Sequence, residues 1–485
     1  MKYFISILVL TIITLNLSAQ QFEYISKENL KKKVEYLSSK ELAGRLPGTE
    51  GYNKAAEFSA EIFQEAGLKP FGDSAYYQFL EVESNEILEP IEFTLINDER
   101  EEEFVLGDDF IFRGFTGNGN IEKEVVFCGY GISRPDLNYD DYSGIDVNDK
   151  IVMVFKYNPS WKINDEPWGT NYPREKSWTA FKHGAKGIIF ISFPNDKSPQ
   201  EHIGSVLHGS GKQINDFPQL HASLNSAAKF FKDTKHKLSE VQAIIDSTKS
   251  PLSFNLNTKA RIQVTSKYQE KSKTMNVVGL IEGSDDKLKN EFIVIGAHLD
   301  HVGQQGKDIY FPGANDNASG SAAVLSIAQE ISKMEVKPKR SIIFVLFASE
   351  EQGLFGAEHF VKKSPVPIES ISAMINMDCV GYGDSIQIGN GKSSPILWEI
   401  AYTIDSKNND MMIERTWSGG GADAAPFHEA GIPALYFVTT NSYEHLHKIT
   451  DTAETLNYDL YNKLTKLALL TLIETADNYE REIVK

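Results

Sequence analysis

Short apolar runs recur through the second half of the chain, separated by segments with helical spacing, and this alternation limits the possible folds more than any other feature. The runs cover residues 276–281, 292–297, 341–347, 373–377 and 434–438. Runs that are short and apolar on both faces are typical of strands buried in a mostly parallel sheet. Helices are expected between them, most clearly at residues 318–334 and 459–477. We therefore predict an α/β fold with a mostly parallel central sheet flanked by helices.

The stretch from about residue 85 to 265 has a different pattern. Its short β-like runs, including 125–128, 151–157 and 187–192, are separated by polar turns, which predicts a second, β-rich domain. Residues 225–250 are rich in Lys and Ser and are expected to be solvated.

The chain has 485 residues, more than one ordinary domain of about 100–200 residues contains. Residues 28–67 have helical spacing that stops at Gly67, and they precede the β-rich stretch. The predicted organisation is therefore a main domain formed by residues 20–90 and 266–485, with an inserted domain at residues 91–265.

The first 19 residues have the features of a signal peptide. A basic start at Lys2 precedes an apolar stretch at residues 4–17, and the small residues Ser18 and Ala19 follow it. The apolar stretch is shorter than the roughly 20 residues that span a bilayer. We expect an exported protein, periplasmic or secreted, whose mature form has no stable membrane span.

Charge and cysteine content exclude some classes of function. Lys plus Arg number 49 against 67 Asp plus Glu, a formal net charge of -18, so the surface repels a phosphate backbone and nucleic acid is not an expected partner. The only cysteines, Cys128 and Cys379, are too few for a disulfide framework. We expect both to be buried free thiols.

Polar side chains follow the predicted strands, where open α/β sheets bind ligands. These residues are His298, Asp300, His301, Asp316, Glu350, Glu351, Asp378, His445 and His447. Imidazole and carboxylate groups are typical zinc ligands, and a pair of metal ions needs a bridging carboxylate as well as terminal ligands. Adjacent glutamates at a strand end point in different directions, so one can bind metal while the other acts as a base.

Five motifs in this part of the chain resemble those of the M28 family of zinc aminopeptidases, in the family order. They are residues 297–301, 313–320, 349–353, 376–378, and His447 followed by residues 451–452. The resemblance implies a zinc exopeptidase fold and two Zn²⁺ ions per chain. It also implies a cis peptide bond between Asp316 and Asn317.

The resemblance assigns a role to each residue of the site. The implied metal ligands are His298 and Asp378 on one zinc, Glu351 and His447 on the other, and Asp316 between them. Glu350 matches the general base, which acts on a water that bridges the zinc ions. Asp300 matches a carboxylate that orients His298, and Asp451 is a second supporting carboxylate. His447 is preferred to His445 as a ligand because of its spacing to Asp451, and His301 and His428 are expected in supporting or loop roles.

The resemblance extends beyond the site. Residues 42–70 resemble the N-terminal segment of the same enzymes, and residues 128–132, 140–142, 147–152 and 184–187 resemble a protease-associated (PA) domain. One loop departs from the family pattern. Residues 422–424 read Ala-Asp-Ala where many relatives have Ser-Asp-His, and Gly419 to Gly421 before them are expected to form a flexible loop.

The function implied by these features is that of an exported two-zinc aminopeptidase acting on peptides with a free N-terminus. Three alternatives stay open. A carboxypeptidase or dipeptidase would use the same zinc ions with a different pocket, and a basic cluster that receives a C-terminal carboxylate would support it. A glutaminyl cyclase would use a single zinc. A receptor-like, non-catalytic relative would be expected to have lost ligands, and none is missing here.

Overall fold

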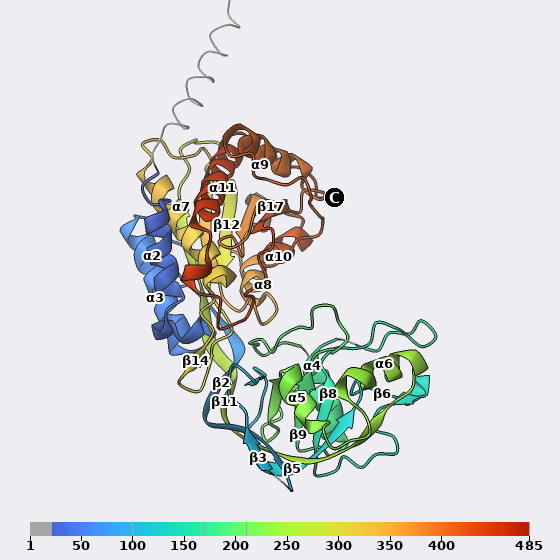
Figure 1. The fold of residues 1–485 in the computed structure, drawn as a ribbon. Helices are drawn as coiled ribbons and strands as arrows, with labels where there is room; N and C mark the ends of the chain where they lie inside the picture. The colour runs from blue at the N-terminus through green and yellow to red at the C-terminus, as the bar shows by residue number, and fades with distance from the viewer. Residues whose placement is uncertain (1–21, 99, 170, 210, 485) are drawn as a thin grey trace, which may run out of the picture.

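The computed structural model describes residues 22–98, 100–169, 171–209 and 211–484. The predicted signal peptide, residues 1–19, lies outside these residues. Among them, no helix combines the length and the apolar character that a membrane crossing requires. Two lobes are visible, a larger one that contains both ends of the described chain and a smaller one formed by its middle part (Figure 1).

The larger lobe is built on a sheet whose central strands are parallel. In spatial order its strands are β17 (Ile386–Gly389), β18 (Ala434–Thr439), β16 (Ile371–Met377), β12 (Phe292–His298), β15 (Ser341–Phe347) and β11 (Ser253–Ile281). β18, β16, β12 and β15 pair in parallel, and the two outer strands, β17 and β11, are antiparallel to their neighbours. The predicted mostly parallel sheet is thus confirmed. The run 276–281 is antiparallel to its neighbour β15 rather than parallel. It is the end of β11, which enters the sheet from the smaller lobe in the opposite direction.

Helices cover both faces of this sheet. One face carries α2 (Lys27–Leu37), α3 (Glu50–Glu65), α7 (Gly320–Lys333), α9 (Pro395–Asn408) and α11 (Tyr458–Asn478), and the other carries α8 (Phe355–Lys362) and α10 (Ala424–Glu429). Side chains of β12 alternate between the two cores: Ile293 and Ile295 pack beneath the first group of helices, and Val294 packs with Phe427 of α10. Burial on both faces explains why the strands appear as continuous apolar runs.

The smaller lobe has its own sheet and cores. Its strands are β4 (Phe110–Phe112), β5 (Gly119–Cys128), β8 (Ile151–Phe155), β9 (Gly187–Ile191) and β10 (Gln219–Ala222), and its helices are α4 (Pro173–Lys182), α5 (Leu224–Phe230) and α6 (Leu238–Thr248). The expectation that residues 225–250 are solvated is wrong. Ala227, Phe230, Val241 and Ile245 are buried in the core, while Ser239 and Ser247 of α6 face outward and Ser226 of α5 is buried.

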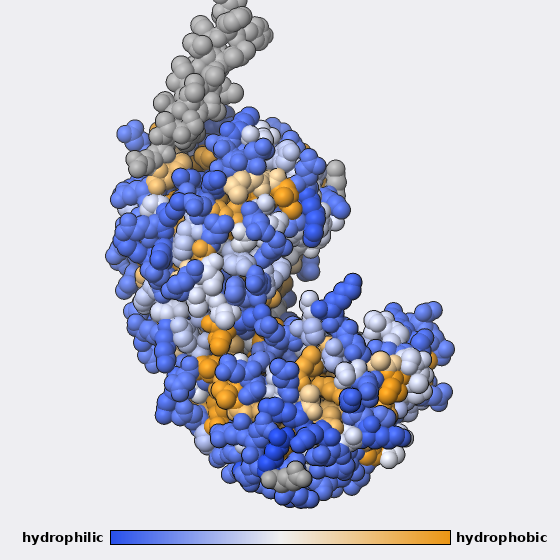
Figure 2. All heavy atoms as spheres, viewed as in Figure 1, coloured by the Kyte–Doolittle hydropathy of each residue, from blue (hydrophilic) through white to orange (hydrophobic). Residues whose placement is uncertain are grey.

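Two long strands connect the lobes. β2 (Tyr77–Asn97) pairs antiparallel with β11 from Tyr77 to Ile96, so the predicted boundaries near residues 90 and 265 fall inside these strands. A further apolar cluster joins the lobes directly: Leu46, Val302 and Phe311 of the larger lobe pack with Ile111 and Val206 of the smaller one. Figure 2 shows a mostly polar face with a hollow between the lobes on the right.

Short elements complete the fold. They are β1 (Lys69–Pro70), β3 (Arg100–Glu103), β6 (Ser133–Arg134), β7 (Tyr139–Asp140), β13 (Gln304–Gln305), β14 (Ile309–Tyr310), and the helical turns Lys40–Arg45, Pro135–Leu137, Ala314–Ser319, Ile368–Ser370 and Ala453–Thr455. Cys128 and Cys379 are buried and free, as predicted.

Candidate metal centre

The polar side chains predicted at the strand ends come together at the carboxyl edge of the larger sheet. They are His298 at the end of β12, Asp316 in the turn before α7, Glu350 and Glu351 after β15, Asp378 after β16, and His447 in the loop after β18. Strands that are parallel end at the same edge, so residues far apart in sequence meet there.

His298 and Asp378 form one group of metal-type donors together with Asp316. His298 Nε2 lies 3.3 Å from Asp316 Oδ1 and 3.5 Å from Asp378 Oδ1. Its other ring nitrogen, Nδ1, is 3.2 Å from the carbonyl oxygen of Asp300. Donation from Nδ1–H to that carbonyl leaves the Nε2 lone pair facing the carboxylates, which is the arrangement a metal-binding histidine needs.

His447 and Glu351 form the second group. His447 Nε2 lies 2.8 Å from Glu351 Oε2 and 3.2 Å from Asp316 Oδ2. Asp316 therefore turns one carboxylate oxygen toward each histidine. A bridging carboxylate between two metal ions would have this geometry.

His301, expected in a supporting or loop role, also lies in the second group. Its Nδ1 is 2.8 Å from Glu351 Oε1 and 3.7 Å from Asp316 Oδ2. The His301 ring is fully buried, and its Nε2 has no hydrogen-bond partner among the described residues. His445, the alternative ligand, instead contacts Thr450 Oγ1 at 2.9 Å through Nδ1.

The donor set fits metal ions. Within each group, the ligand atoms of His301, Asp316, Glu351 and His447, and of His298, Glu350 and Asp378, lie within 4.8 Å of one another. Asp378 Oδ1 is buried and has no hydrogen-bond partner among the described residues. Carboxylates buried this closely require positive charge, and imidazole with carboxylate is the donor set that zinc prefers.

Two further carboxylates fix the backbone of the site. Asp451 accepts hydrogen bonds from the backbone N–H groups of Asn315 at 2.8 Å and Asp316 at 3.0 Å. Asp300 accepts from the N–H groups of Glu350 at 3.1 Å and Glu351 at 3.3 Å, while its carboxylate Oδ1 is 3.8 Å from His298 Nδ1. Asp300 thus holds the two glutamates, and its carbonyl oxygen contacts His298. The Asp316–Asn317 peptide bond is cis, as expected.

Arg45 is a part of the site that sequence reasoning left without a role. It is fully buried, and its guanidinium donates to the carbonyl oxygens of Leu299 at 2.8 Å, Pro312 at 2.8 Å and Gly313 at 3.0 Å, and also to that of Leu37. Burial lowers the pKa of Arg45 to about 10, and the nearby Asp316 and Asp300 oppose this change. A positive charge at neutral pH therefore lies behind two of the ligand loops.

Glu350 lies farther from His298 than Asp316 and Asp378 do. Its Oε2 is 4.0 Å from His298 Nε2. Burial raises the pKa of Glu350 well above its usual value; the His298 ring opposes the rise, and the carboxylates of Asp423 and Glu351 add to it. A raised pKa makes a carboxylate a better proton acceptor.

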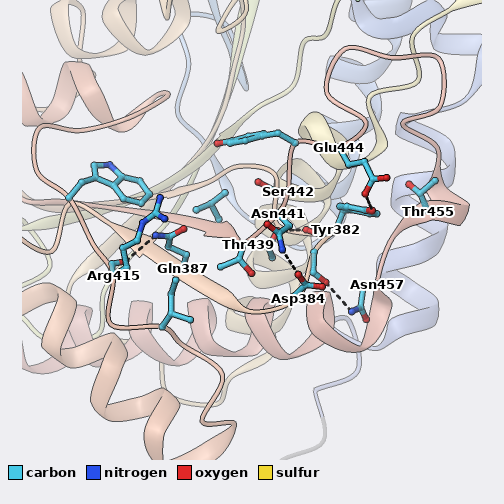
Figure 3. Close-up of a pocket in the computed structure, with 16 residues that line it drawn as sticks. Tyr382, Asp384, Gln387, Arg415, Thr439, Asn441, Ser442, Glu444, Thr455 and Asn457 are labelled. Carbon is cyan, nitrogen blue, oxygen red and sulfur yellow. Dashed lines mark hydrogen bonds between the residues drawn. The ribbon is translucent and has the colours of Figure 1, made fainter. Parts of the chain in front are cut away.

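A cavity of about 830 Å³ lies one side chain away from Asp378. Tyr436 Oη is 3.2 Å from Asp378 Oδ2 and 3.3 Å from the Oη of Tyr443, which lines the cavity. In Figure 3, Arg415 and Gln387 lie together at one end, and Glu444, Thr455 and Asn457 lie at the other.

The loop that departs from the family pattern borders this cavity. Ala422 packs with Trp417, which lines the cavity, whereas Ala424 is buried in the core with Phe427. Asp423, between them, is fully buried, and neither carboxylate oxygen has a hydrogen-bond partner among the described residues. The altered loop therefore lies beside a residue that lines the cavity.

The smaller lobe also touches the centre. The Gly204 N–H donates to the carbonyl oxygen of His447 at 2.8 Å, and His208 Nδ1 lies 3.3 Å from the carbonyl oxygen of Glu351. Glu201 forms an ion pair with Lys448 at 2.8 Å. Two residues of the second donor group, His447 and Glu351, are thus contacted by the segment 201–208.

Together, the fold and this donor set define an α/β protein with a metal centre at the carboxyl edge of its sheet. Residues 276–472 match peptidase family M28, and this part of the chain belongs to that family. It contains every predicted ligand and Glu350.

Relatives and solved structures agree with this assignment. A "Glutamate carboxypeptidase 2 homolog" of Caenorhabditis briggsae is 23% identical over 88% of this chain and 64% of its own length. An "Aminopeptidase" of Pseudomonas aeruginosa (strain UCBPP-PA14) is 25% identical over 74% of this chain and 59% of its own length, so the chain spans less than two thirds of either relative. The solved aminopeptidase from Aneurinibacillus sp. strain AM-1 has the same fold, with a TM-score of 0.64, 20% identity, and coverage of 96% of this chain and 97% of that chain. A zinc aminopeptidase from Bacillus subtilis superposes with a TM-score of 0.62 and 18% identity, covering 96% and 99% of the two chains.

Proposed function

We propose that this protein is a two-zinc metallo-exopeptidase that removes N-terminal residues from peptides. The observation that carries the proposal is the position of Asp316, whose two carboxylate oxygens lie 3.3 Å from His298 Nε2 and 3.2 Å from His447 Nε2. One zinc would be held by His298, Asp378 and Asp316. The other would be held by Glu351, His447 and Asp316.

The residues around the ions would perform distinct tasks. Zinc, when bound, supplies Lewis-acid polarisation of the scissile carbonyl group and of the attacking water. Glu350 accepts the proton of that water and passes it to the leaving amine. Asp300 keeps Glu350 in place through the backbone N–H at 3.1 Å, and Asp451 does the same for Asp316. The buried edge limits access of bulk water, which strengthens these electrostatic interactions.

Relatives with different names bear on which end of the peptide is cleaved. The Pseudomonas aeruginosa relative and the two solved structures are named aminopeptidases, which supports the N-terminal reading. The Caenorhabditis briggsae relative is named a glutamate carboxypeptidase 2 homolog. Arg415 is exposed, lines the cavity and forms no ion pair with any described residue, so it could accept a substrate carboxylate. Carboxypeptidase activity is therefore the second candidate.

The activity is tested with one set of peptides and a metal analysis. Release of the first amino acid from unblocked peptides, and none from N-acetylated ones, is expected together with about two zinc ions per chain. Release of the last residue from N-acetylated peptides would assign a carboxypeptidase. A cyclised product without cleavage would assign a glutaminyl cyclase, and no turnover by the zinc-loaded protein would assign a non-catalytic relative.

We also propose that the protein is exported and that the smaller lobe is a PA domain. The leader-like residues 1–19 support export, and the insertion between β2 and β11 supports the domain assignment, since it carries the motif-like segments 128–132 and 184–187. N-terminal sequencing of protein from the periplasmic and secreted fractions should begin near residue 20. An intact leader in the cytoplasmic fraction would contradict export.

A further inference from the structure

Three basic side chains are buried together in the smaller lobe without an acidic partner. Arg113 follows β4 and is 6% exposed, Lys156 follows β8 and is 3% exposed, and His221 lies in β10 and is 0% exposed. No carboxylate of the described residues forms a hydrogen bond or an ion pair with any of them. These three residues are called the basic cluster below.

All three side chains converge on the segment 200–203 and its contacts. Lys156 Nζ donates to Gln200 Oε1 at 2.6 Å, and Arg113 Nη1 donates to the carbonyl oxygen of Ile203 at 3.4 Å. His221 Nε2 lies 3.0 Å from Ser192 Oγ, which in turn donates to the Gln200 carbonyl oxygen at 2.5 Å. The cluster is thus one connected group rather than three separate residues.

Two polar atoms of the cluster are left without a partner in the part of the chain that the structure describes. Arg113 Nε and His221 Nδ1 are both buried and have no hydrogen-bond partner among the described residues. An unmet buried donor typically costs about 1–3 kcal/mol. Ser192 Oγ gives its proton to Gln200, so His221 Nε2 carries the N–H that reaches Ser192, and Nδ1 of the neutral ring carries a lone pair. An anion between these neighbouring strands would accept directly from Arg113 Nε, and from Nδ1 once its charge protonates the ring.

Arg113 is the member of the cluster that keeps an uncompensated positive charge. Burial lowers the pKa of Lys156 well below its usual value, and Arg113 lowers it further. Burial likewise lowers the pKa of His221, and Lys156 and Arg113 add to the effect. Arg113 itself stays charged at neutral pH, because burial lowers its pKa only to about 10. A buried cation without a counter-ion is strongly unfavourable.

We propose that the basic cluster binds a small oxyanion, with a carboxylate or a phosphate-type group as its recognised chemistry. Arg113 supplies a charged planar donor fork, and Lys156 and His221 add charge and donors once a bound anion raises their pKa, which together suit oxygen atoms of an anion. The site lies outside the metal centre and makes no use of the residues proposed to bind zinc.

An anion bound at the basic cluster would also affect a segment that contacts the metal-ligand loops. The segment that it contacts continues to Gly204 and His208, which touch the backbone of His447 and Glu351. An anion beneath Gln200 and Ile203 would hold this segment against the metal-ligand loops.

The proposal is tested by calorimetric titration of the full-length protein with sulfate, phosphate and acetate at constant ionic strength. One saturable site is expected with both zinc-loaded and zinc-stripped protein, because the cluster is separate from the metal centre. Binding only to the zinc-loaded form would place the anion on the metal and overturn the proposal. Tighter binding of sulfate and phosphate than of acetate would identify the phosphate-type group, and the reverse order would identify a carboxylate.

Substitutions in the basic cluster test whether the anion binds there. Arg113→Met is expected to weaken binding at least about 10-fold, the loss of one charge-assisted hydrogen bond, and Lys156→Met serves if the first variant does not fold. Lys156→Arg should retain binding, and Lys182→Met, an exposed lysine of the same lobe, should leave it unchanged. Equal affinity in Arg113→Met, Lys156→Met and the parent protein would mean that the anion binds elsewhere, and no saturable binding in the parent would mean that the cluster is only a strained polar core.

Discussion

His301 Nδ1 lies 2.8 Å from Glu351 Oε1, while the other oxygen of Glu351 faces His447. A hydrogen bond on one carboxylate oxygen fixes which oxygen is left for a metal ion. We therefore predict that His301→Phe, which keeps a ring but cannot donate, lowers the affinity for one of two zinc ions by about 10- to 100-fold. Chelator-competition titration measures both affinities.

The control for this change is His445→Phe. His445 lies two residues before His447 but contacts Thr450 rather than the donor groups. Its substitution should leave both zinc affinities unchanged. If His301→Phe binds both ions as tightly as the parent does, the His301 contact has no role in metal binding.

Glu350→Gln tests the general base. The amide has nearly the same shape but cannot accept the proton, so kcat should fall by about 10²- to 10⁴-fold, while zinc content and the thermal unfolding midpoint stay close to those of the parent. Steady-state kinetics and metal analysis of the purified variant check both expectations. Glu358→Gln, a half-exposed glutamate on α8 that pairs with Lys362, is the matched control. Full activity of a zinc-loaded Glu350→Gln protein would remove Glu350 from the mechanism.

The central sheet could be predicted because its strands are apolar on both faces. Val294 and Ile295 pack in opposite cores, so the run 292–297 contains no polar residue to break the pattern. The site residues were recognisable for a related reason, since all but Asp316, which lies in the turn before α7, follow such a run, and all reach the same sheet edge. His298 and Asp378 are examples.

Other features depend on contacts between distant segments. Arg45 acts through carbonyl oxygens more than 250 positions away, which no local pattern indicates. The contact between the smaller lobe and the site is another such feature. His208 contacts Glu351 only because β2 and β11 bring the two lobes together. The burial of α5 and α6 was missed because their Lys and Ser residues hide an apolar face formed by Ala227, Phe230, Val241 and Ile245.

Arg45→Met is predicted to destabilise the protein. It removes every hydrogen bond from the guanidinium to the carbonyl oxygens of Leu37, Leu299, Pro312 and Gly313, and it removes a charge that faces the acidic centre. The free energy of unfolding should fall by about 3 kcal/mol or more, as for other broken buried charge networks. Arg45→Lys should restore little of the lost stability. One ammonium group cannot reach carbonyl oxygens that are arranged around a planar guanidinium group. Urea unfolding measures the effect, with the exposed Arg100→Met as the control; complete rescue by lysine would contradict this role.

Lys33 on α2 makes stability depend on pH. Its side chain is almost fully buried, and burial lowers its pKa to about 8 despite the opposing charge of Glu330. Between pH 8 and 10.5 the unfolded chain binds more protons than the folded one, so this residue makes stability rise with pH in that window, and its unfavourable effect is fully present below pH 8.

Lys33→Met should therefore stabilise the protein at pH 7, by up to about 3 kcal/mol from the pKa difference. Glu330 keeps its hydrogen bonds from the N–H groups of Tyr24 and Ile25, so the substitution leaves no unpaired carboxylate. The gain should shrink as pH rises from 8 toward 10.5, because the parent lysine loses its charge there. Urea unfolding at several pH values measures this, and Lys32→Met, an exposed neighbour that pairs with Glu28, should show no comparable gain. A gain that does not change with pH would mean that packing, rather than the buried charge, is responsible.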